Sequence, residues 1–324
     1  MFNAKNTDRK SLWRTVLMAI AAIMIVCTTF THASAGDIKQ KSYASPEEAV
    51  KVLIDAIKAN NNQELLAIFG PEGKEIISSG DEVADKNARE RFLSDYEEKN
   101  KLEEETPDKV VLDVGSDDWP FPIPIVKKGE RWVFDTKDGK DELLSRRIGR
   151  NELNTIQVMH AYVDAQREYV SKGRDGKGDI EFAQKIISTE GKHDGLYWKA
   201  KEREEESPFG PLIAEAVKGG YTLKKKQGGQ PIPYHGYFFK ILKAQGKDAP
   251  GGQYVYVVNG KMILGFALLA YPASYGSSGI MTFIINQDDA VYQKDLGKNT
   301  AEIAESITGY NPDKTWTKVE EPEQ

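Results

Sequence analysis

The sequence predicts an α+β fold built in two units. Apolar residues follow helical spacing up to about residue 100, alternate between residues 109 and 135, and return to helical spacing from residue 141. After residue 237 they form short strand-like runs. Helical spacing indicates amphipathic helices, and alternation indicates half-buried strands. The repeated change of period predicts two helix-plus-sheet layers, at residues 43–145 and 146–318, with a boundary near residues 140–150.

The first helix of the first unit has two start signals. Ser45 is placed to cap the helix while Glu48 reaches back, and Pro46 occupies the first helical position, where its missing N–H costs nothing. Three asparagines at 60–62 are expected to end this helix. The same spacing predicts two further helices, at 63–69 and 81–100.

Three strands are predicted after these helices, so that the helices lie on a small curved antiparallel sheet. They cover residues 109–114, 121–126 and 131–135, and Lys128-Gly129-Glu130 is a hairpin turn signal between the last two. Prolines at every second position of 121–126 remove hydrogen-bond donors. This segment is therefore expected at a sheet edge or outside the sheet.

The second unit is predicted to pack a long helix on an antiparallel sheet. The helix covers 141–171 with a joint at Gly149, further helical turns are expected at 182–187, and the charged segments 172–179 and 201–230 are expected to be solvated loops. Asn259-Gly260 is a strong hairpin signal. The predicted strands are 237–242, 254–258, 263–271, 280–285 and 290–294, and a final helix is predicted at 300–308.

The first thirty-five residues resemble a secretory signal peptide. Four basic residues precede an apolar run at 16–27, and Ala33-Ser34-Ala35 supplies the small residues that a signal peptidase reads. Cleavage is expected between Ala35 and Gly36, which places the protein in the periplasm or outside the cell. A retained membrane anchor and lipidation at Cys27 are the alternatives.

Composition excludes several classes of function for the processed chain. Cleavage would leave 289 residues and change the formal charge from −6 to −9, since the leader holds four basic residues and one acidic residue. An acidic chain is a poor nucleic-acid binder. The only cysteine, Cys27, lies in the leader, so disulfides, thiolate metal sites and cysteine nucleophiles are excluded. No segment after residue 35 is apolar enough to span a bilayer.

Three histidines would remain after cleavage, and none has metal-ligand spacing to another. His160 lies in a predicted helix among apolar neighbours and is interpreted as a packing residue. His193 with Asp194 is a candidate base and orienting acid, although adjacent residues rarely face each other. His235 is expected in a turn.

Two loop motifs resemble known kinds of site in part. Gly276-Ser277-Ser278-Gly279 lacks the Gly-x-Ser-x-Gly form of a nucleophile elbow and is interpreted as a turn. Asp175–Asp179 with Glu181 resembles part of a calcium loop, but Lys177 occupies a ligand position. No catalytic, cofactor-binding or metal-ligating residue and no cofactor is therefore assigned.

Each half of the chain resembles a known kind of domain. The helices of 45–69, followed by helix, strand and strand, resemble cone domains of the nuclear-transport-factor-two-like type. The second half is similar to the soluble part of type IV pilin-like proteins, although Asp289-Ala290 stands where such hairpins usually carry a glycine. The residues that carry the second likeness are the helix 151–171, Gly236–Phe239, Gly265–Pro272, Ser278-Gly279 and Thr282–Asn286.

Residues 45–318 as a whole resemble an uncharacterised bacterial exported family, domain of unknown function 2950. The stretches that carry this resemblance are Phe182–Lys185, Asp194–Trp198, Val258–Met262 and Val291–Gly297. The resemblance implies no known activity, cofactor or catalytic residue.

These observations favour a non-catalytic binding or assembly module of the cell envelope, with an envelope protein or a cell-wall polymer as partner. The second unit is expected to face the partner through strand edges and its aromatic residues, most of which should fill its core. The alternative is an envelope hydrolase with a carboxylate-based site in the first unit. Oligomeric state and ligand are not specified by the sequence. The aromatic residues of the second unit are Tyr197, Trp198, Tyr234, Tyr237, Phe238, Tyr254, Tyr256, Tyr271 and Tyr275.

Protein purified from an envelope or secreted fraction is expected to begin at Gly36, because the leader has the order of a cleavable signal. Intact-mass spectrometry measures this directly. Full-length chain recovered from the cytoplasm would contradict the prediction.

Overall fold

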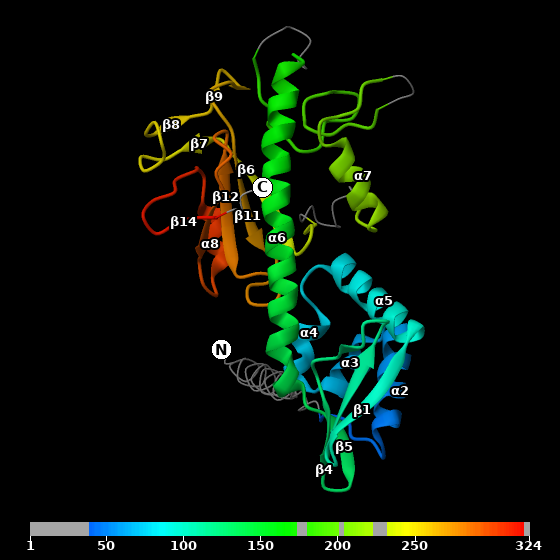
Figure 1. Ribbon diagram of the computed structural model, residues 1–324. Coiled ribbons are helices and arrows are strands. Elements are labelled where there is room, and N and C mark those ends of the chain that lie inside the picture. Colours follow the sequence, from blue (N-terminus) through cyan, green and yellow to red (C-terminus); the bar gives the residue numbers. More distant parts are fainter. Residues whose placement is uncertain (1–38, 174–179, 201–203, 223–231, 321–324) are drawn as a thin grey trace, which may run out of the picture. The chain divides into compact units, whose positions relative to one another are not determined.

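The computed structural model describes residues 39–173, 180–200, 204–222 and 232–320 (Figure 1). These residues form helices and antiparallel sheets, so the predicted α+β class is confirmed. The leader and the Asp175–Asp179 loop lie outside the described residues. Within the described ranges, no helix is both long and apolar enough to cross a membrane.

Local capping sets the first helices. In front of α2 (Pro46–Lys58), the Ser45 hydroxyl accepts a hydrogen bond from the N–H of Glu48 at 3.2 Å, and the Glu48 carboxylate accepts one from the N–H of Ala44 at 2.6 Å. The predicted Ser45 cap is therefore present, and Glu48 reaches back one residue further than predicted, to Ala44. The elements that follow are α3 (Asn62–Phe69), the 3₁₀ turn η1 (Pro71–Gly73), α4 (Lys74–Ile77) and α5 (Glu82–Glu98).

The first sheet has the strand order β1-β2-β4-β5, with β3 paired to β2. Residues 121–124 lie outside its strands, as the alternating prolines predict, but Ile125 begins a strand between β2 and β5. The sequence did not predict β1, whose acidic residues lack an apolar face. Its strands are β1 (Asn100–Thr106), β2 (Lys109–Val114), β3 (Trp119–Pro120), β4 (Ile125–Lys128) and β5 (Arg131–Phe134).

One uninterrupted helix, α6 (Thr136–Ser171), follows the first sheet. It passes through the predicted boundary near residue 145, and the expected joint at Gly149 is absent from it. The described residues form two separate hydrophobic cores, one built from residues 43–134 before α6 and the other from residues 159–310, which include the second half of α6. The division into units at residue 145 stays a prediction.

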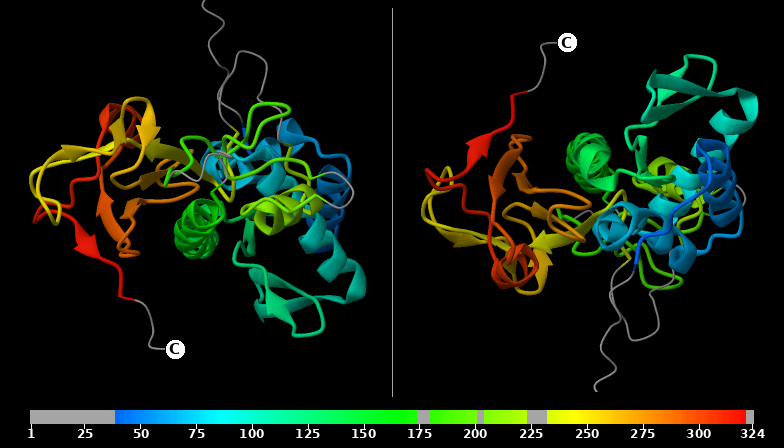
Figure 2. Two further views of the ribbon diagram at one scale, coloured as in Figure 1. Left: turned by 90° about the horizontal axis from the view of Figure 1, so that it is seen from above. Right: turned by 90° about the horizontal axis from the view of Figure 1, so that it is seen from below.

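The second sheet has the order β14-β13-β12-β11-β6, and α6 packs on β11 and β12. Figure 2 shows α6 nearly end-on with this sheet along one side. Every residue of β11 is buried, since both α6 and α8 (Thr300–Ser306) contact it. The strands are β6 (Tyr237–Leu242), β11 (Ala267–Pro272), β12 (Met281–Asn286), β13 (Tyr292–Asp295) and β14 (Thr317–Lys318).

Two small hairpin-like pairs accompany the second sheet. The pair β9 (Val257–Val258) and β10 (Lys261–Met262) is joined by Asn259 and Gly260, with φ of 51° and 80°. Both residues are left-handed, so the predicted Asn-Gly hairpin is confirmed. The other pair is β7 (Ala244–Gln245) with β8 (Tyr254–Val255).

Two predictions for residues 182–230 are wrong. Residues 182–187 are not helical, because Phe182 bridges Met262 and Ile187 bridges Tyr197. A short apolar run does not distinguish a helix from extended chain, and here cross-chain pairing takes the backbone groups. The segment 201–230, expected to be loop throughout, contains helix α7 (Gly210–Lys218), which begins with Pro211 in its first turn.

The two glycines of α6 stand in opposite surroundings. A Cβ on Gly139 would lie 2.1 Å from the carbonyl oxygen of Pro122 and 2.6 Å from the nitrogen of Ile123. A Cβ on Gly149 would meet nothing within 4 Å. Gly139 is therefore required by close backbone packing, whereas Gly149 is not.

Gly149→Ala is expected to stabilise the fold by about 1 kcal/mol, the helix propensity gained by alanine. Gly139→Ala gains the same propensity but clashes with backbone, and is expected to destabilise by about 2 kcal/mol. Chemical denaturation of the two variants beside the unchanged protein measures both. An equal effect of the two substitutions would contradict the packing described for Gly139.

Candidate functional site

Arginines from two helices line one groove of about 460 Å³. Arg91 comes from α5, and Arg146, Arg147 and Arg150 come from α6. Against these four guanidinium groups stand the carboxylates of Asp85 and Glu215, so the lining is positive within an acidic chain. We call this site the arginine groove; its lining also includes Trp119, Asn151, Asn154, Tyr221, Tyr234 and His235.

Arg147 forms the base of the groove. Its guanidinium donates hydrogen bonds to the carbonyl oxygen of Glu75 at 2.7 Å, to the carbonyl oxygen of Ile76, and to the Ser277 hydroxyl at 3.3 Å. These carbonyls belong to the short helix α4, whose last turn leaves them without intrahelical partners. Burial lowers the pKa of Arg147, and the Asp85 carboxylate opposes that shift. An arginine nevertheless stays protonated, so Arg147 is a fixed positive charge.

Arg146 is held by two neighbours. Its Nε lies 2.6 Å from the Glu142 carboxylate, and its guanidinium lies over the Trp119 ring, 5.3 Å from the centroid. Both contacts fix the plane of the guanidinium. Much of its charge is therefore already compensated by Glu142.

Arg91 and Arg150 differ from the other two arginines. Among the residues that the structure describes, neither forms a hydrogen bond or an ion pair. Burial and the neighbouring charge of Arg91 lower the pKa of Arg150. Two like charges held near each other create a local positive potential that favours an anion.

Asp85 is the acidic residue inside this basic lining. Its two carboxylate oxygens accept from the N–H of Ser79 at 3.2 and 3.0 Å. Burial raises the pKa of Asp85, while the Ser79 hydrogen bonds and the charges of Arg147 and Arg89 oppose that shift. The carboxylate is thus both partly desolvated and close to cations.

A buried carboxylate fixes the other end of the groove. Asp81 caps α5 by accepting from the N–H groups of Val83 and Ala84 at 3.1 and 3.0 Å. Its second oxygen accepts from the Tyr221 hydroxyl and from the N–H of Gly236, both at 2.9 Å. Four donors satisfy this carboxylate, so its role is to hold the aromatic end of the groove in place.

The aromatic end contains three rings in mutual contact. Tyr234 lies 4.9 Å from Tyr221 and 4.1 Å from His235 between ring centroids. Burial, opposed by the Asp81 charge, lowers the pKa of His235, so this imidazole is neutral at pH 7. It does not add to the positive charge.

An apolar hollow of about 430 Å³ adjoins the arginine groove. The two share nine lining residues, among them Arg91, Arg146, Arg147 and Arg150. Away from the shared residues the hollow is lined by Arg89 and Asp95 and by the apolar side chains of Leu53, Ile57, Leu65, Phe69, Ile77, Phe92 and Phe121. The polar lining of the groove and the apolar lining of the hollow therefore meet at these arginines.

A family model described as "Protein of unknown function (DUF2950)" matches residues 40–319, which include the arginine groove, the apolar hollow and both sheets. The chain belongs to the DUF2950 family. Neither a curated protein nor a solved structure matches this DUF2950 chain significantly. The likenesses to nuclear-transport-factor-two-like and pilin-like domains stay predictions.

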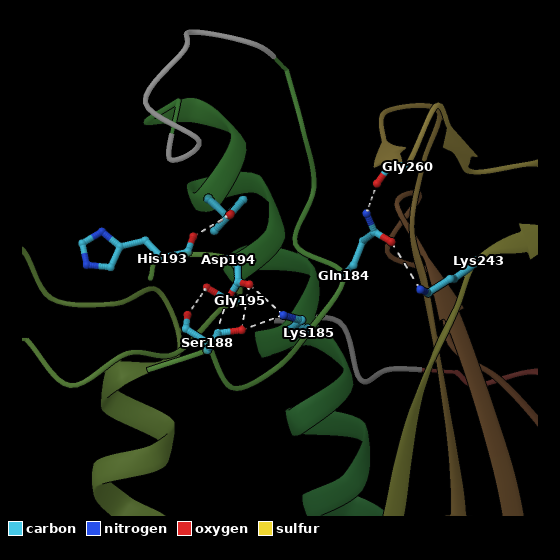
Figure 3. A network of polar contacts seen from close by, with 10 residues as sticks. Gln184, Lys185, Ser188, His193, Asp194, Gly195, Lys243 and Gly260 are labelled. Carbon is cyan, nitrogen blue, oxygen red and sulfur yellow. Dashed lines mark hydrogen bonds and ion pairs between the residues drawn. The ribbon is translucent and has the colours of Figure 1, made fainter. Parts of the chain in front are cut away.

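In this DUF2950 protein the His193–Asp194 pair does not form. Figure 3 shows the His193 ring directed away from the Asp194 carboxylate. Asp194 is bonded instead to Lys185 at 2.7 Å and to the N–H and hydroxyl of Thr189 at 2.7 and 2.9 Å. The His193 ring stacks on Trp198, and its Nε2 lies 3.0 Å from Glu204. Both residues therefore order the loop.

His160 joins α6 to the turn after β12. Its Nδ1 lies 2.8 Å from Asp289, which also pairs with Arg167 at 3.2 Å. Asp289 has φ of 62°, the left-handed conformation for which glycine is usual at this hairpin position. The side-chain contacts hold an aspartate there, so the contact of His160 shown by the structure is this polar one.

The remaining sequence candidates are in turns. His235 and Gly236 are both left-handed and connect Tyr234 to Tyr237 in a two-residue turn, so the predicted turn is confirmed. In the Gly276–Gly279 segment, the N–H of Gly276 donates to the carbonyl oxygen of Gly279, which is also a turn. Within the described ranges, no group of three or more metal-ligating side chains comes together.

The arginines were not predicted from the sequence as site residues. A signal was present, because Arg146, Arg147 and Arg150 occur within five residues of one predicted helix. Five of the seven arginines in the described part of the chain line the groove or the adjoining hollow. What the sequence lacked was the proximity of α5, which brings Arg91 beside Arg150.

The Asp194 carboxyl is expected to titrate near pH 2. Burial acts against this shift, but the hydrogen bonds from Lys185 and Thr189 lower the pKa of Asp194 to about 2. A lowered folded-state pKa stabilises the loop above the unfolded value of about 3.9, and the gain is lost as pH falls from about 4 to 2. The effect on global stability is small, because 37% of the side chain is exposed.

A carbon-detected NMR titration of the Asp194 carboxyl measures this pKa. In Asp194→Asn, the amide of Thr189 is expected to exchange faster with solvent at pH 7. A midpoint near 3.9 would contradict the network drawn in Figure 3.

Proposed function

We propose that this protein is an exported cell-envelope protein that acts as a non-catalytic binding module, and that the arginine groove binds an anionic group of its ligand. The observation that carries the proposal is the pair Arg91 and Arg150. Both line the groove, the charge of Arg91 acts on Arg150, and neither has an ion-pair partner among the described residues. A ligand anion would supply the missing counter-charge.

The chemistry of the groove supports an oxygen anion. A guanidinium presents donors in a planar fork that matches carboxylate and phosphate groups. Arg147 adds a fixed positive charge at the base, and Asn151 and Asn154 add polar side chains to the lining. The acidic chain around the groove disfavours a long polyanion such as nucleic acid.

The second predicted unit contributes most of the groove. Three of the four arginines and the Tyr221, Tyr234 and His235 cluster all lie within residues 146–318. This supports the proposal that the second unit faces the partner. An envelope protein or a cell-wall polymer that presents carboxylate or phosphate groups fits the groove, and the leader supports an envelope location.

The alternative function is that of a carboxylate-based envelope hydrolase. One observation favours it: Asp85 lines the groove, and burial raises its pKa toward the range of a general acid. Turnover of an ester, glycoside or amide substrate that is abolished by Asp85→Asn would favour the enzyme over the binding module.

The test of binding uses inorganic pyrophosphate and citrate as probes in isothermal titration calorimetry. Arg91→Gln combined with Arg150→Gln is expected to weaken the binding of pyrophosphate at least tenfold. Each charge-assisted hydrogen bond contributes about 1.5–3 kcal/mol, and 1.4 kcal/mol is tenfold in affinity. Binding is also expected to weaken at high salt.

The matched control is Lys128→Gln combined with Lys298→Gln, which removes the same charge from exposed positions outside the groove. This control should bind pyrophosphate within about twofold of the unchanged protein. If both double variants lose the same affinity for pyrophosphate, the loss comes from the change in net charge, and the proposal is overturned. So would failure of the unchanged protein to bind either probe.

A further inference from the structure

We infer that the ligand of the arginine groove is a single-chain lipid with a terminal phosphate monoester, whose hydrocarbon chain enters the apolar hollow behind the arginines. This inference rests on the proposed function, because the phosphate would be the anion held in the groove. It adds a ligand class that neither the groove nor the hollow would specify alone.

The charge of the rim favours a dianion. Arg146 is paired with Glu142, and the charge of Arg147 is opposed by the Asp85 carboxylate, which leaves the charges of Arg91 and Arg150 to be matched. A phosphate monoester carries close to two negative charges at pH 7, whereas a carboxylate carries one. The phosphate therefore matches the two unpaired guanidinium groups more closely.

The hollow behind the rim favours a hydrocarbon chain. Its volume of about 430 Å³ lies in the range of small-molecule sites, and leucine, isoleucine and phenylalanine side chains line it. Asp85, Arg89 and Asp95 also line the hollow, so this argument applies to its leucine, isoleucine and phenylalanine part. Water against that part finds few hydrogen-bond partners, so displacing it by an apolar chain is favourable.

The residues shared by the groove and the hollow determine where the phosphate and the hydrocarbon chain of the ligand would lie. Arg91, Arg146, Arg147 and Arg150 line both spaces, together with Ala88 and Trp119. A phosphate held at these arginines is at the mouth of the apolar hollow. Ala88, Trp119 and Leu143, which also line both spaces, give a chain attached to that phosphate an apolar path into the hollow.

The test compares inorganic phosphate, decyl phosphate, decanoate and decanol in isothermal titration calorimetry, below the micelle concentration of each amphiphile. Each buried methylene favours binding by about fourfold. Decyl phosphate is therefore expected to bind at a one-to-one ratio and at least a hundredfold more tightly than inorganic phosphate. Decanoate should bind at least tenfold more weakly than decyl phosphate, and decanol more weakly still.

Two variants test the binding of the hydrocarbon chain separately from the binding of the phosphate. Ile57→Trp on α2 places a large ring at a half-buried position that lines the hollow but not the groove. It is expected to lower the affinity for decyl phosphate at least tenfold and to leave pyrophosphate binding unchanged. Val52→Trp, also half-buried on α2 but outside both spaces, is the matched control. Phe92→Trp, at a half-buried position of α5 that lines the hollow but not the groove, serves if Ile57→Trp does not fold.

The outcomes separate this inference from the proposed function. If pyrophosphate binds and decyl phosphate binds no more tightly than inorganic phosphate, the lipid inference is wrong and anion binding stands. Equal affinity for decanoate and decyl phosphate would overturn the inference that the headgroup is a phosphate. If decanol binds as tightly as decyl phosphate and the Arg91→Gln/Arg150→Gln protein is unaffected, both proposals fail.

Discussion

The 36-residue helix α6 is the constraint on which the rest of the structure depends. At about 1.5 Å per residue it is roughly 54 Å long, more than one small core can cover. Its start is fixed where the Thr136 hydroxyl donates to the carbonyl oxygen of Phe69, and its second half packs Met159 and Tyr162 into the other core. The residues between these two anchored ends include the arginines, so the groove occupies the part of α6 that neither core buries fully.

Arg147 links this constraint to the proposed chemistry. Its guanidinium satisfies carbonyls at the end of α4 and so fixes α4 against α6. Because a buried charge is tolerated only when it is well hydrogen-bonded, Arg147 is committed to the fold. Arg91 and Arg150 are exposed and have no such commitment among the described residues, and burial and the Arg91 charge both disfavour the charged form of Arg150, so an anion here would be favourable. Arg147, which stabilises the fold, thus lines the same groove as the two arginines that we propose bind the ligand.

Features encoded within a few residues were predictable. The Ser45 cap and the Asn259-Gly260 turn depend on local hydrogen bonds and backbone conformation, and both are present. Features that depend on distant partners were not. Residues 182–187 are extended because Met262 and Tyr197 pair with them, and α7 forms in a segment dominated by charged neighbours.

The sequence by itself determined the α+β class, the local caps and turns, and the membership of the chain in its family. It also showed a basic cluster at residues 146–150, but a cluster on one helix is most often a solvated face. Only the tertiary structure decided that Arg91 of α5 lies close enough to Arg150 of α6 to perturb its pKa, and that an apolar hollow opens behind both. The physical reason is that electrostatic interaction and burial depend on distance in space, and neighbours on separate helices leave no periodic signal in the sequence.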